Sequence, residues 1–452
     1  MPKKKKKPEV KEVVQILRGM QDLLGSERKP WDYFFEKAKK LASGFGYEKI
    51  NTPILEEQWL FKKGLGEAAE IIKKQIYEFF DRRGKIRIAL RPDFAPCVMR
   101  AYIDHEMFNL PQPVRLYYSG PVFRYEKLEP KRYHQFHIFG LQSIGLDKPI
   151  ADAELIVYAD TLFKNLGLKV NIEINNMGCS RCRSFYRKKL YNFLKKKKKN
   201  LCVECREHLE KNPFRIFDCE KRTCQEIVLL SPQLLNSLCP KCEAYFSKAL
   251  EYLDGVGVVY HLNPYLIRSA DYYNGPIFEI YSSLSSEKFQ SLSPKEKTAL
   301  PGLPEVGGVK LGTGGRFDRL AQSLGGPSTP ACGLSLGVER IVDEMKERKI
   351  KIHNGKKNRI FLCQISDLSL LEGLKLKKLL VEEGFEVVDD LKNESLSAQL
   401  EKANKLNLRF ILILGHQEIL DKSIIIRDLI THSQEVVSRE KIVNELKKCL
   451  KR

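Results

Sequence analysis

Between Cys179 and Cys242 the chain carries eight of its twelve cysteines, so any fold must bring these thiols together or bury them one by one. They form four close pairs: Cys179 and Cys182, Cys202 and Cys205, Cys219 and Cys224, Cys239 and Cys242. Two thiolates close in sequence can hold one ion from a tight turn, and four complete a tetrahedral zinc shell. A reducing compartment disfavours disulfides, and isolated buried cysteines would not need such pairing. The pattern predicts structural zinc and leaves open how many ions bind and which pairs share one.

Composition excludes two broad classes of chain. The 452 residues are 43% hydrophobic, which argues against disorder. No run approaches the roughly 18 apolar residues of a membrane span, and the basic N-terminus leads into no apolar segment, so we expect a soluble cytoplasmic protein. The 78 Lys and Arg against 57 Asp and Glu leave a net charge of +21, which favours a polyanionic partner such as nucleic acid. Part of this charge lies in the runs Lys3–Lys7 and Lys195–Lys199, which are also typical of solvated tails and loops.

The order of hydrophobic patterns predicts several parts. A basic segment, 1–30, precedes a core formed by 31–175 and 256–345, which the cysteine-rich stretch 176–255 interrupts; a polar linker, Lys349–Asn358, leads to a small α/β domain, 359–452.

Individual elements follow from periodicity. Predicted helices are Trp31–Phe45, Ala151–Leu166, Arg183–Leu194, Pro240–Leu253, Arg316–Leu324, Val338–Arg348, Ser369–Glu383 and Ser397–Leu406. Predicted strands are Lys49–Leu55, Ile86–Leu90, Val114–Tyr118, Val122–Tyr125, His137–Ser143, Lys169–Ile174, Val258–Leu262, Pro276–Tyr281, Arg359–Gln364, Glu386–Asp389 and Arg409–Gly415. The alternation in the last domain favours a largely parallel sheet.

The stretch Gly120–Glu126, followed by Tyr133–Gly140, carries the most specific chemistry. The planar fork of Arg124 suits a phosphate and a carboxylate together. Glu126, two residues further on, could accept from an amine, and Phe136 offers a face on which a purine can stack. The alternative interpretation is a salt-bridged antiparallel hairpin.

This stretch resembles motif 2 of class II aminoacyl-tRNA synthetases, and its Phe-Arg-x-Glu and Arg-Tyr-x-Gln-Phe-His strings resemble histidyl-tRNA synthetases. Five further segments resemble signatures of that family in the expected order: Arg18–Asp22, Gly46–Pro53 (motif 1), Leu90–Asp93, Arg268–Tyr273 and Gly314–Asp318, followed by motif 3 at Gly333–Arg340. The resemblance covers essentially the whole chain.

The resemblance implies an α+β fold: a class II antiparallel-sheet catalytic core, a cysteine-rich helical insertion and a C-terminal α/β domain of the anticodon-binding type. It implies activation of histidine with ATP and Mg²⁺, transfer to tRNA(His), and a homodimer formed through motif 1. The implied catalytic residues are Arg124 and Arg268. The implied histidine-binding residues are Asp93, Ala95, Arg124, Gln142, Arg268, Tyr272 and Tyr273, and the implied ATP-binding residues are Arg124, Glu126, Phe136 and Arg340.

Purely structural roles remain open alternatives for several of these positions. Arg316 and Asp318 could close a helix start, and Gly312–Gly315 could be a tight turn. One of Tyr272 and Tyr273 is expected in the core, and His134 and His137 could be structural.

The departures from the family pattern cluster where the amino acid is read. Ile138 and Gln142 replace the usual Gln and an acidic residue, and Ala95 replaces a Thr; Ser269 and Ala270 replace the usual Gly and Leu. Each lost buried hydrogen bond costs about tenfold to a hundredfold in affinity. The leading hypothesis is therefore a histidyl-tRNA synthetase with an altered pocket. The alternatives are a regulatory paralogue without aminoacylation activity and a zinc-stabilised nucleic-acid-binding protein.

Overall fold

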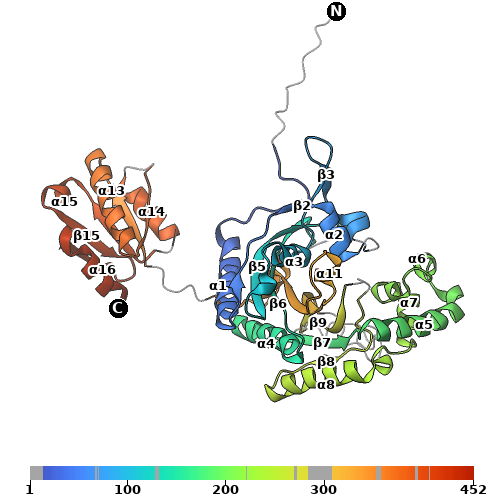
Figure 1. The fold of residues 1–452 in the computed structure, drawn as a ribbon. Helices are drawn as coiled ribbons and strands as arrows, with labels where there is room; N and C mark the ends of the chain where they lie inside the picture. The colour runs from blue at the N-terminus through green and yellow to red at the C-terminus, as the bar shows by residue number, and fades with distance from the viewer. Residues whose placement is uncertain are drawn as a thin grey trace, which may run out of the picture. The chain divides into compact units, whose positions relative to one another are not determined.

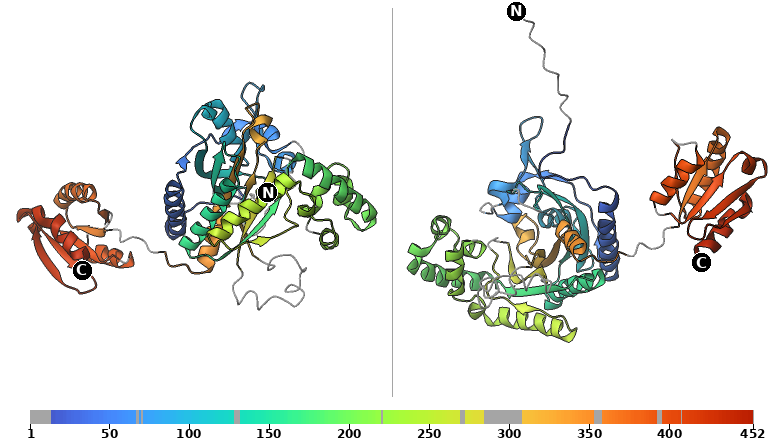
Figure 2. Two further views of the ribbon diagram at one scale, coloured as in Figure 1. Left: turned by 60° about the horizontal axis from the view of Figure 1, so that its bottom comes forward. Right: turned by 180° about the vertical axis from the view of Figure 1, so that it is seen from behind.

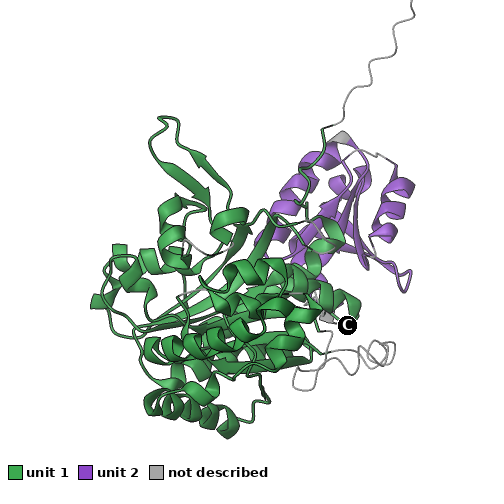
Figure 3. Ribbon diagram, turned by 90° about the vertical axis from the view of Figure 1, so that its right-hand side faces the viewer, with its two compact units in different colours: residues 1–352 green, residues 353–452 purple. Residues whose placement is uncertain are grey.

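The computed structural model describes residues 14–451 apart from 67–68, 70, 128–131, 220, 269–271, 284–307, 353–357, 392–394 and 407. Lys3–Lys7 and Ser269–Asp271 thus lie outside the described residues. The chain forms two compact units, 1–352 and 353–452 (Figure 3). No helix in the described part is long and apolar enough to cross a membrane.

The first unit is built on an eight-stranded sheet (Figure 1). The strands lie in the order β1 (Glu48–Lys49), β5 (Val114–Phe123), β6 (Gln135–Ile144), β11 (Ala331–Gly337), β10 (Lys310–Arg316), β9 (Asn274–Ser282), β7 (Val170–Asn176) and β8 (His261–Leu262). The pairs β1–β5 and β7–β8 are parallel, and the central pairs are antiparallel. The predicted antiparallel core is confirmed.

Helices cover both faces of this sheet because successive strand side chains point in opposite directions. Phe139 packs in a core with the helices α1 (Arg28–Gly44), α4 (Pro149–Leu166), α8 (Pro240–Gly255) and α12 (Val338–Glu347). Its neighbour Ile138 packs in another core with α3 (Ala95–Asp104) and α11 (Leu320–Ser323). A small sheet of β2 (Leu55–Glu57), β4 (Arg87–Leu90) and β3 (Glu78–Phe80), together with α2 (Gln58–Leu65), completes the core.

The cysteine-rich stretch is helical, as predicted. It contains α5 (Ser180–Lys196), α6 (Val203–His208), α7 (Arg222–Leu229) and α8. Figures 1 and 2 show α5, α6 and α7 grouped at one end of the unit, while α8 runs beside α4. Tyr186, Leu190 and Phe214 form a core of their own in this group. Lys195–Lys199 are exposed, as expected of a solvated run.

Several boundaries differ from the prediction, and close packing explains the clearest case. Gly312–Gly315 is not a turn but part of β10, and the predicted helix Arg316–Leu324 shrinks to α11. A Cβ at Gly314 would lie 2.2 Å from Phe278 and 2.5 Å from the Gly333 carbonyl, so the strands can approach only at glycine.

Four predicted strands also change. Val114–Tyr118 and Val122–Tyr125 are one strand, β5, because Gly120 and Pro121 keep extended pairing with β6. The predicted strand Lys49–Leu55 is two short strands on either side of Asn51–Ile54, and Val258–Leu262 is reduced to β8.

The second unit is a five-stranded sheet in the order β13 (Glu386–Asp389), β12 (Arg359–Gln364), β14 (Phe410–Leu414), β15 (Ser423–Asp428), β16 (Gln434–Ser438). The first three strands are parallel and the last two antiparallel, so the predicted parallel sheet holds for part of it only. The helices are α13 (Asp367–Glu382), α14 (Leu396–Lys405), α15 (His416–Leu420) and α16 (Ile442–Lys451). Two apolar cores lie in this unit, one of them around Leu362 and Leu412 and the other around Phe361 and Ile411.

Candidate functional site

A cavity of about 300 Å³ lies on one face of the eight-stranded sheet, and Ile138 is among the residues that line it. Strands β6, β10 and β11, the end of β5 and the start of α12 contribute to its walls. All ten residues to which the sequence assigned substrate contacts line it: Asp93, Ala95, Arg124, Glu126, Phe136, Gln142, Arg268, Tyr272, Tyr273 and Arg340. Segments up to 247 residues apart in sequence thus meet at one cavity.

Arg124 directly follows β5 and is held from two sides. Its Nε donates to the Pro92 carbonyl at 2.9 Å, and its Nη2 lies 3.5 Å from Asp93 Oδ2. Its Nη1 lies 4.0 Å from Glu126, and its guanidinium stands 5.3 Å from the centre of the Phe136 ring. The fork is therefore oriented before any substrate arrives, at low conformational cost.

Arg268 is anchored by a buried carboxylate from the neighbouring strand. Its Nη2 lies 2.7 Å from Glu279 and donates to the Thr313 hydroxyl, and Lys310 lies 2.8 Å from the same carboxylate. Burial alone would lower the pKa of Arg268, but the attraction of Glu279 raises it, so the guanidinium stays charged. Burial would likewise raise the pKa of Glu279, and Arg268 and Lys310 instead bring it down to about 2.

The motif 3 segment supplies the third guanidinium. Arg340 lies in the first turn of α12, and its Nη1 donates to the Lys310 carbonyl at 3.1 Å. Burial lowers its pKa from the ordinary arginine value. The adjacent Glu339 accepts from the His137 backbone N–H at 2.9 Å and lies 3.0 Å from its ring nitrogen, so His137 fastens α12 to β6.

His134 is structural as well, which resolves one of the open alternatives. It is buried, its Nδ1 lies 3.0 Å from the Tyr77 hydroxyl and its Nε2 2.9 Å from the Glu126 carbonyl. It thereby supports the backbone of a cavity residue rather than facing the cavity.

The cavity wall also contains a carboxylate, two tyrosines and an amide. Asp93 Oδ1 accepts from the Ala95 N–H at 3.1 Å, which orients the carboxylate. Tyr272 and Tyr273 both line the cavity, with ring centres 4.3 Å apart, and both also pack against apolar cores, where one of them was expected. Gln142 is 1% exposed, and neither its amide nitrogen nor its oxygen makes a hydrogen bond within the described part of the chain.

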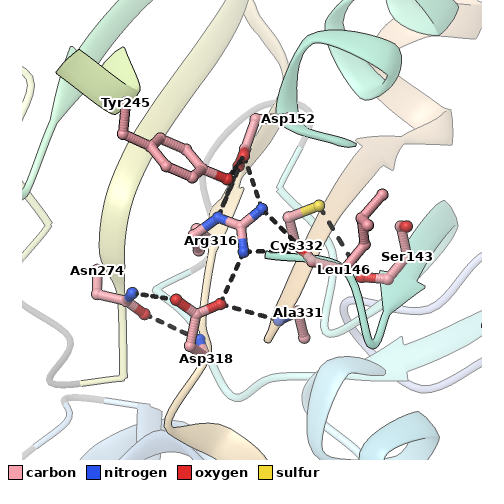
Figure 4. Close-up of polar contacts among 9 residues, drawn as sticks. All are labelled: Ser143, Leu146, Asp152, Tyr245, Asn274, Arg316, Asp318, Ala331 and Cys332. Atoms are coloured by element: carbon pink, nitrogen blue, oxygen red, sulfur yellow. Dashed lines mark hydrogen bonds and ion pairs between the residues drawn. The ribbon is translucent and has the colours of Figure 1, made fainter. Parts of the chain in front are cut away.

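The Gly-Gly-Arg-Phe-Asp segment does something different from closing a helix (Figure 4). Arg316 ends β10 and is buried, with its Nη2 2.7 Å from Asp152 of α4 and its Nη1 2.9 Å from Asp318. Tyr245 of α8 donates to the same Asp152 at 2.8 Å. Arg316 and Asp152 do not belong to the cavity wall. Their pairing could not be predicted from local pattern because the two residues are 164 positions apart.

Other functional neighbours were also missed. Glu279, Lys310, Thr313 and Tyr118 lie in or behind the cavity wall and belong to none of the segments that resemble a binding motif, whereas Ser335 lies within motif 3 but was assigned no role. A buried glutamate in the alternating strand Asn274–Ser282 is the one sequence signal that could have pointed to a partner for Arg268.

The eight clustered cysteines form two groups of four. Cys179, Cys182, Cys239 and Cys242, here the first set, have sulfur atoms all within 4.8 Å of one another. The same holds for Cys202, Cys205, Cys219 and Cys224, the second set. The outer pairs thus come together, as do the inner pairs, and no disulfide joins any of the twelve cysteines, all of which lie in the described part of the chain.

Comparison with known proteins identifies the family to which this fold belongs. A family model described as histidyl-tRNA synthetase matches residues 19–341, and one described as anticodon binding domain matches 362–449. The histidine–tRNA ligase of Desulfitobacterium hafniense is 37% identical over 92% of this chain and 93% of its own, and that of Desulforamulus reducens is 35% identical over 94% and 97%. The crystal structure of apo histidyl-tRNA synthetase from S. aureus superimposes with a TM-score of 0.77 at 28% identity, covering 96% of this chain and all of that one. The chain belongs to the histidyl-tRNA synthetase family.

Proposed function

We propose that this chain is a histidine–tRNA ligase, which activates histidine with ATP and transfers it to tRNA(His). The observation that carries the proposal is the meeting of Arg124, Arg268 and Arg340 at one cavity, whose wall also holds the Asp93 carboxylate and the buried amide of Gln142. Three guanidinium groups suit a triphosphate, and the carboxylate suits the ammonium of an amino acid. A translation enzyme of this kind works in the cytoplasm.

The first reaction is attack of a histidine carboxylate oxygen on the α-phosphorus of ATP. A C(=O)–O–P bond forms, the bond to the β-phosphate oxygen breaks, and pyrophosphate leaves. Negative charge spreads over the α-phosphoryl oxygens, so Arg124 and Arg268, both oriented by neighbours, would stabilise the transition state. Mg²⁺, when bound to the phosphates, would neutralise part of their charge.

The remaining contacts would position the two substrates. Phe136 would stack on adenine while Glu126 accepts from its amino group, and Arg340 would hold the γ-phosphate. Asp93 would hold the α-ammonium, with Tyr273 and Gln142 near the imidazole. Positioning of this kind removes much of the entropy cost of a two-substrate reaction.

In the second reaction a hydroxyl of the terminal tRNA ribose attacks the adenylate carbonyl, and AMP leaves. Two features support a tRNA partner. One is the second unit, which matches the anticodon-binding model. The other is a basic cavity of about 350 Å³ beside α5, whose lining includes Lys73, Arg187, Lys211 and Arg319. The second unit and the three guanidinium groups disfavour the regulatory paralogue and the inactive nucleic-acid-binding protein.

The direct test is ATP–pyrophosphate exchange measured with each amino acid, followed by charging of tRNA(His). We expect exchange with histidine alone, and loss of about a thousandfold in Arg268→Ala because one donor to the developing charge is removed. The matched control is Arg28→Ala, whose exposed ion pair with Asp32 contributes little. Exchange in Arg268→Ala within a few fold of wild type would refute its assigned role, and exchange with another amino acid would refute the assigned substrate.

We further propose that both cysteine sets hold structural Zn²⁺. A zinc–sulfur bond of about 2.3 Å in a tetrahedron places the sulfurs about 3.8 Å apart. Cys179 and Cys182 have sulfurs 3.6 Å apart, and Cys202 and Cys219 3.8 Å. Elemental analysis after purification under reducing conditions should give about two zinc ions per chain, and a value below about one would contradict the proposal.

A homodimer through the motif 1 segment is also proposed. Ile54 and Leu55, which follow that segment, are 42% and 47% exposed, and Trp59 nearby is 50% exposed. Apolar side chains clustered at a surface favour a partner. Analytical ultracentrifugation should give twice the chain mass, and a Leu55→Asp variant should shift the equilibrium toward the monomer; a monomeric wild type would contradict the proposal.

A further inference from the structure

The junction between β7 and α5 contacts both the first cysteine set and the active-site segment that contains Arg268 and Tyr273. Cys179 is the residue before α5 and Cys182 lies in its first turn, while Cys239 and Cys242 stand in the same two places on α8. The first set therefore fastens two helix N-termini together. Cys239 N–H donates to Cys182 Sγ at 3.0 Å, which is a further contact between the two helix N-termini.

Hydrogen bonds run from this junction to both sides of Arg268–Tyr273. Asn175 donates to the Leu266 carbonyl at 2.8 Å, and the Arg268 N–H points at the Met177 sulfur at 3.5 Å. On the other side, Arg183 Nη1 donates to the Tyr273 carbonyl at 3.0 Å. Arg183 is the residue after Cys182, so a ligand of the first set and a support of the cavity are neighbours in one helical turn.

The backbone repeats this connection. Met177 N–H donates to the Gly275 carbonyl at 2.7 Å, and Gly275 N–H donates to the Gly178 carbonyl at 3.2 Å. A Cβ at Gly178 would lie 2.6 Å from Cys182 Cβ, so the chain passes directly against the first set. Movement of Cys182 would therefore displace the strand end that pairs with Gly275.

The second set is more remote from the cavity. The hydrogen bonds described for its cysteines, such as those from Cys202 N–H to Cys224 Sγ at 3.3 Å and from Cys205 N–H to Cys202 Sγ at 3.5 Å, join residues of 202–224 to one another. Its helices reach the active-site segment through apolar packing with Leu266 and Ile267 and through the Tyr265 hydroxyl, which donates to the Leu229 carbonyl at 2.9 Å. Phe214 of this region also contacts Arg183, whose guanidinium lies 5.2 Å from the centre of its ring. None of these contacts is made by a cysteine of the second set, so we expect loss of order there to affect the active-site segment less than loss of the first set.

We propose that a metal ion in the first set positions the histidine side of the active site, by fixing the first turn of α5 and with it Arg268 and Tyr273. This inference rests on the proposed zinc binding. A bound ion would tie the four sulfur atoms, and with them the N-termini of α5 and α8, to one centre, and this tie is lost when the ion is removed. Arg183 would then no longer be held where its guanidinium donates to the Tyr273 carbonyl. The cavity would remain but would bind histidine less tightly.

The experiment compares two matched double variants in the full chain. Cys239→Ser with Cys242→Ser removes two ligands of the first set from α8, away from the Arg268 segment, and Cys219→Ser with Cys224→Ser does the same in the second set. Each should lower the zinc content from about two to about one per chain. We expect the histidine KM in pyrophosphate exchange to rise at least about tenfold more in the first variant than in the second, with the ATP KM changed less than about threefold.

Two further measurements separate positioning from general loss of structure. Amide hydrogen exchange of 272–278 should quicken in the first-set variant, and circular dichroism should show that its helices persist. Arg183→Gln, which keeps all eight cysteines, should retain both zinc ions and still raise the histidine KM, whereas Arg183→Lys should recover part of the loss.

The outcomes distinguish the two proposals. A wild type without zinc refutes the metal sites themselves. A wild type with two zinc ions, combined with equal histidine KM in the two double variants or an unchanged KM in Arg183→Gln, leaves the metal sites standing and overturns the positioning role.

Discussion

Gln142 shows how a single side chain can point to a substrate. A buried amide without hydrogen bonds costs about 1–3 kcal/mol, so such a group persists where a ligand satisfies it or where function requires it. Its neighbour on the same face, Ile138, gives no polar contact to the cavity, and both Tyr118 and Ser335, whose hydroxyls lie 3.4 Å apart, border the same space. These surroundings favour the proposed hydrogen bond between the Gln142 amide and a ring nitrogen of histidine.

We expect Gln142→Leu, which keeps the size of the side chain but removes both polar atoms, to raise the histidine KM about tenfold or more while the ATP KM stays within about twofold. Gln142→Glu should lower the histidine KM, because a carboxylate accepts from an imidazole N–H more strongly than an amide does. Exchange kinetics of both variants with each substrate varied in turn decide this. An unchanged histidine KM in Gln142→Leu would mean that this side chain does not read the ring.

Glu279 makes stability depend on pH. Its pKa is about 2 in the folded chain, against an ordinary value of 4.5, because Arg268 and Lys310 outweigh the effect of burial. A carboxyl whose pKa is lowered by folding stabilises the fold above about pH 4.5, and this contribution is lost as the pH falls toward 2. We expect Glu279→Gln to lower the melting temperature at neutral pH, and the difference from wild type to shrink as the medium is acidified below the ordinary pKa. A difference that stays constant from neutral to acid would show that the carboxylate charge is not what stabilises this site.

At the scale of elements, the helices and strands that could be predicted are those whose formation depends on the local pattern of apolar residues. Helices with clear periodicity, such as Ala151–Leu166, and the strand Arg359–Gln364 lie within two residues of their expected places. Two other features depend on pairing with neighbouring strands, which the local pattern does not reveal. Two predicted strands merge into β5, and Gly312–Gly315 belong to β10 instead of forming a turn. The site followed the same rule: the motif residues meet at one cavity, whereas Glu279, which holds Arg268, comes from a distant strand that carries no motif.

Arg316 and Asp152 join β10 to α4, and Tyr245 extends the contact to α8 (Figure 4). We expect Arg316→Met to lower the free energy of unfolding by about 3–5 kcal/mol, because Asp152 would be left buried without its partner. Arg316→Met combined with Asp152→Leu should lose less than Arg316→Met alone, since no unpaired charge remains at Asp152. Calorimetry of both variants measures this, and equal losses would show that side-chain volume rather than charge pairing governs the junction.

At the scale of the whole molecule, the two compact units divide the work. Every residue that lines the candidate site belongs to 1–352, and the second unit has apolar cores of its own around Leu362 and Phe361. Neither unit therefore needs the other to bury its core. Activation of histidine should depend on the first unit alone, and selection of tRNA on both.

This division predicts how a chain ending at residue 352 should behave. Its histidine-dependent pyrophosphate exchange should stay within about fivefold of the full chain, whereas charging of tRNA(His) should fall by about a hundredfold or more, because the match to the anticodon-binding model lies wholly in the part removed. The full chain at raised salt is the control: with a net charge of +21, its KM for tRNA should rise steeply while exchange changes little. Equal losses of exchange and charging in the shortened chain would show instead that the second unit supports the catalytic cavity, since the removal of a tRNA contact alone leaves the adenylate reaction untouched.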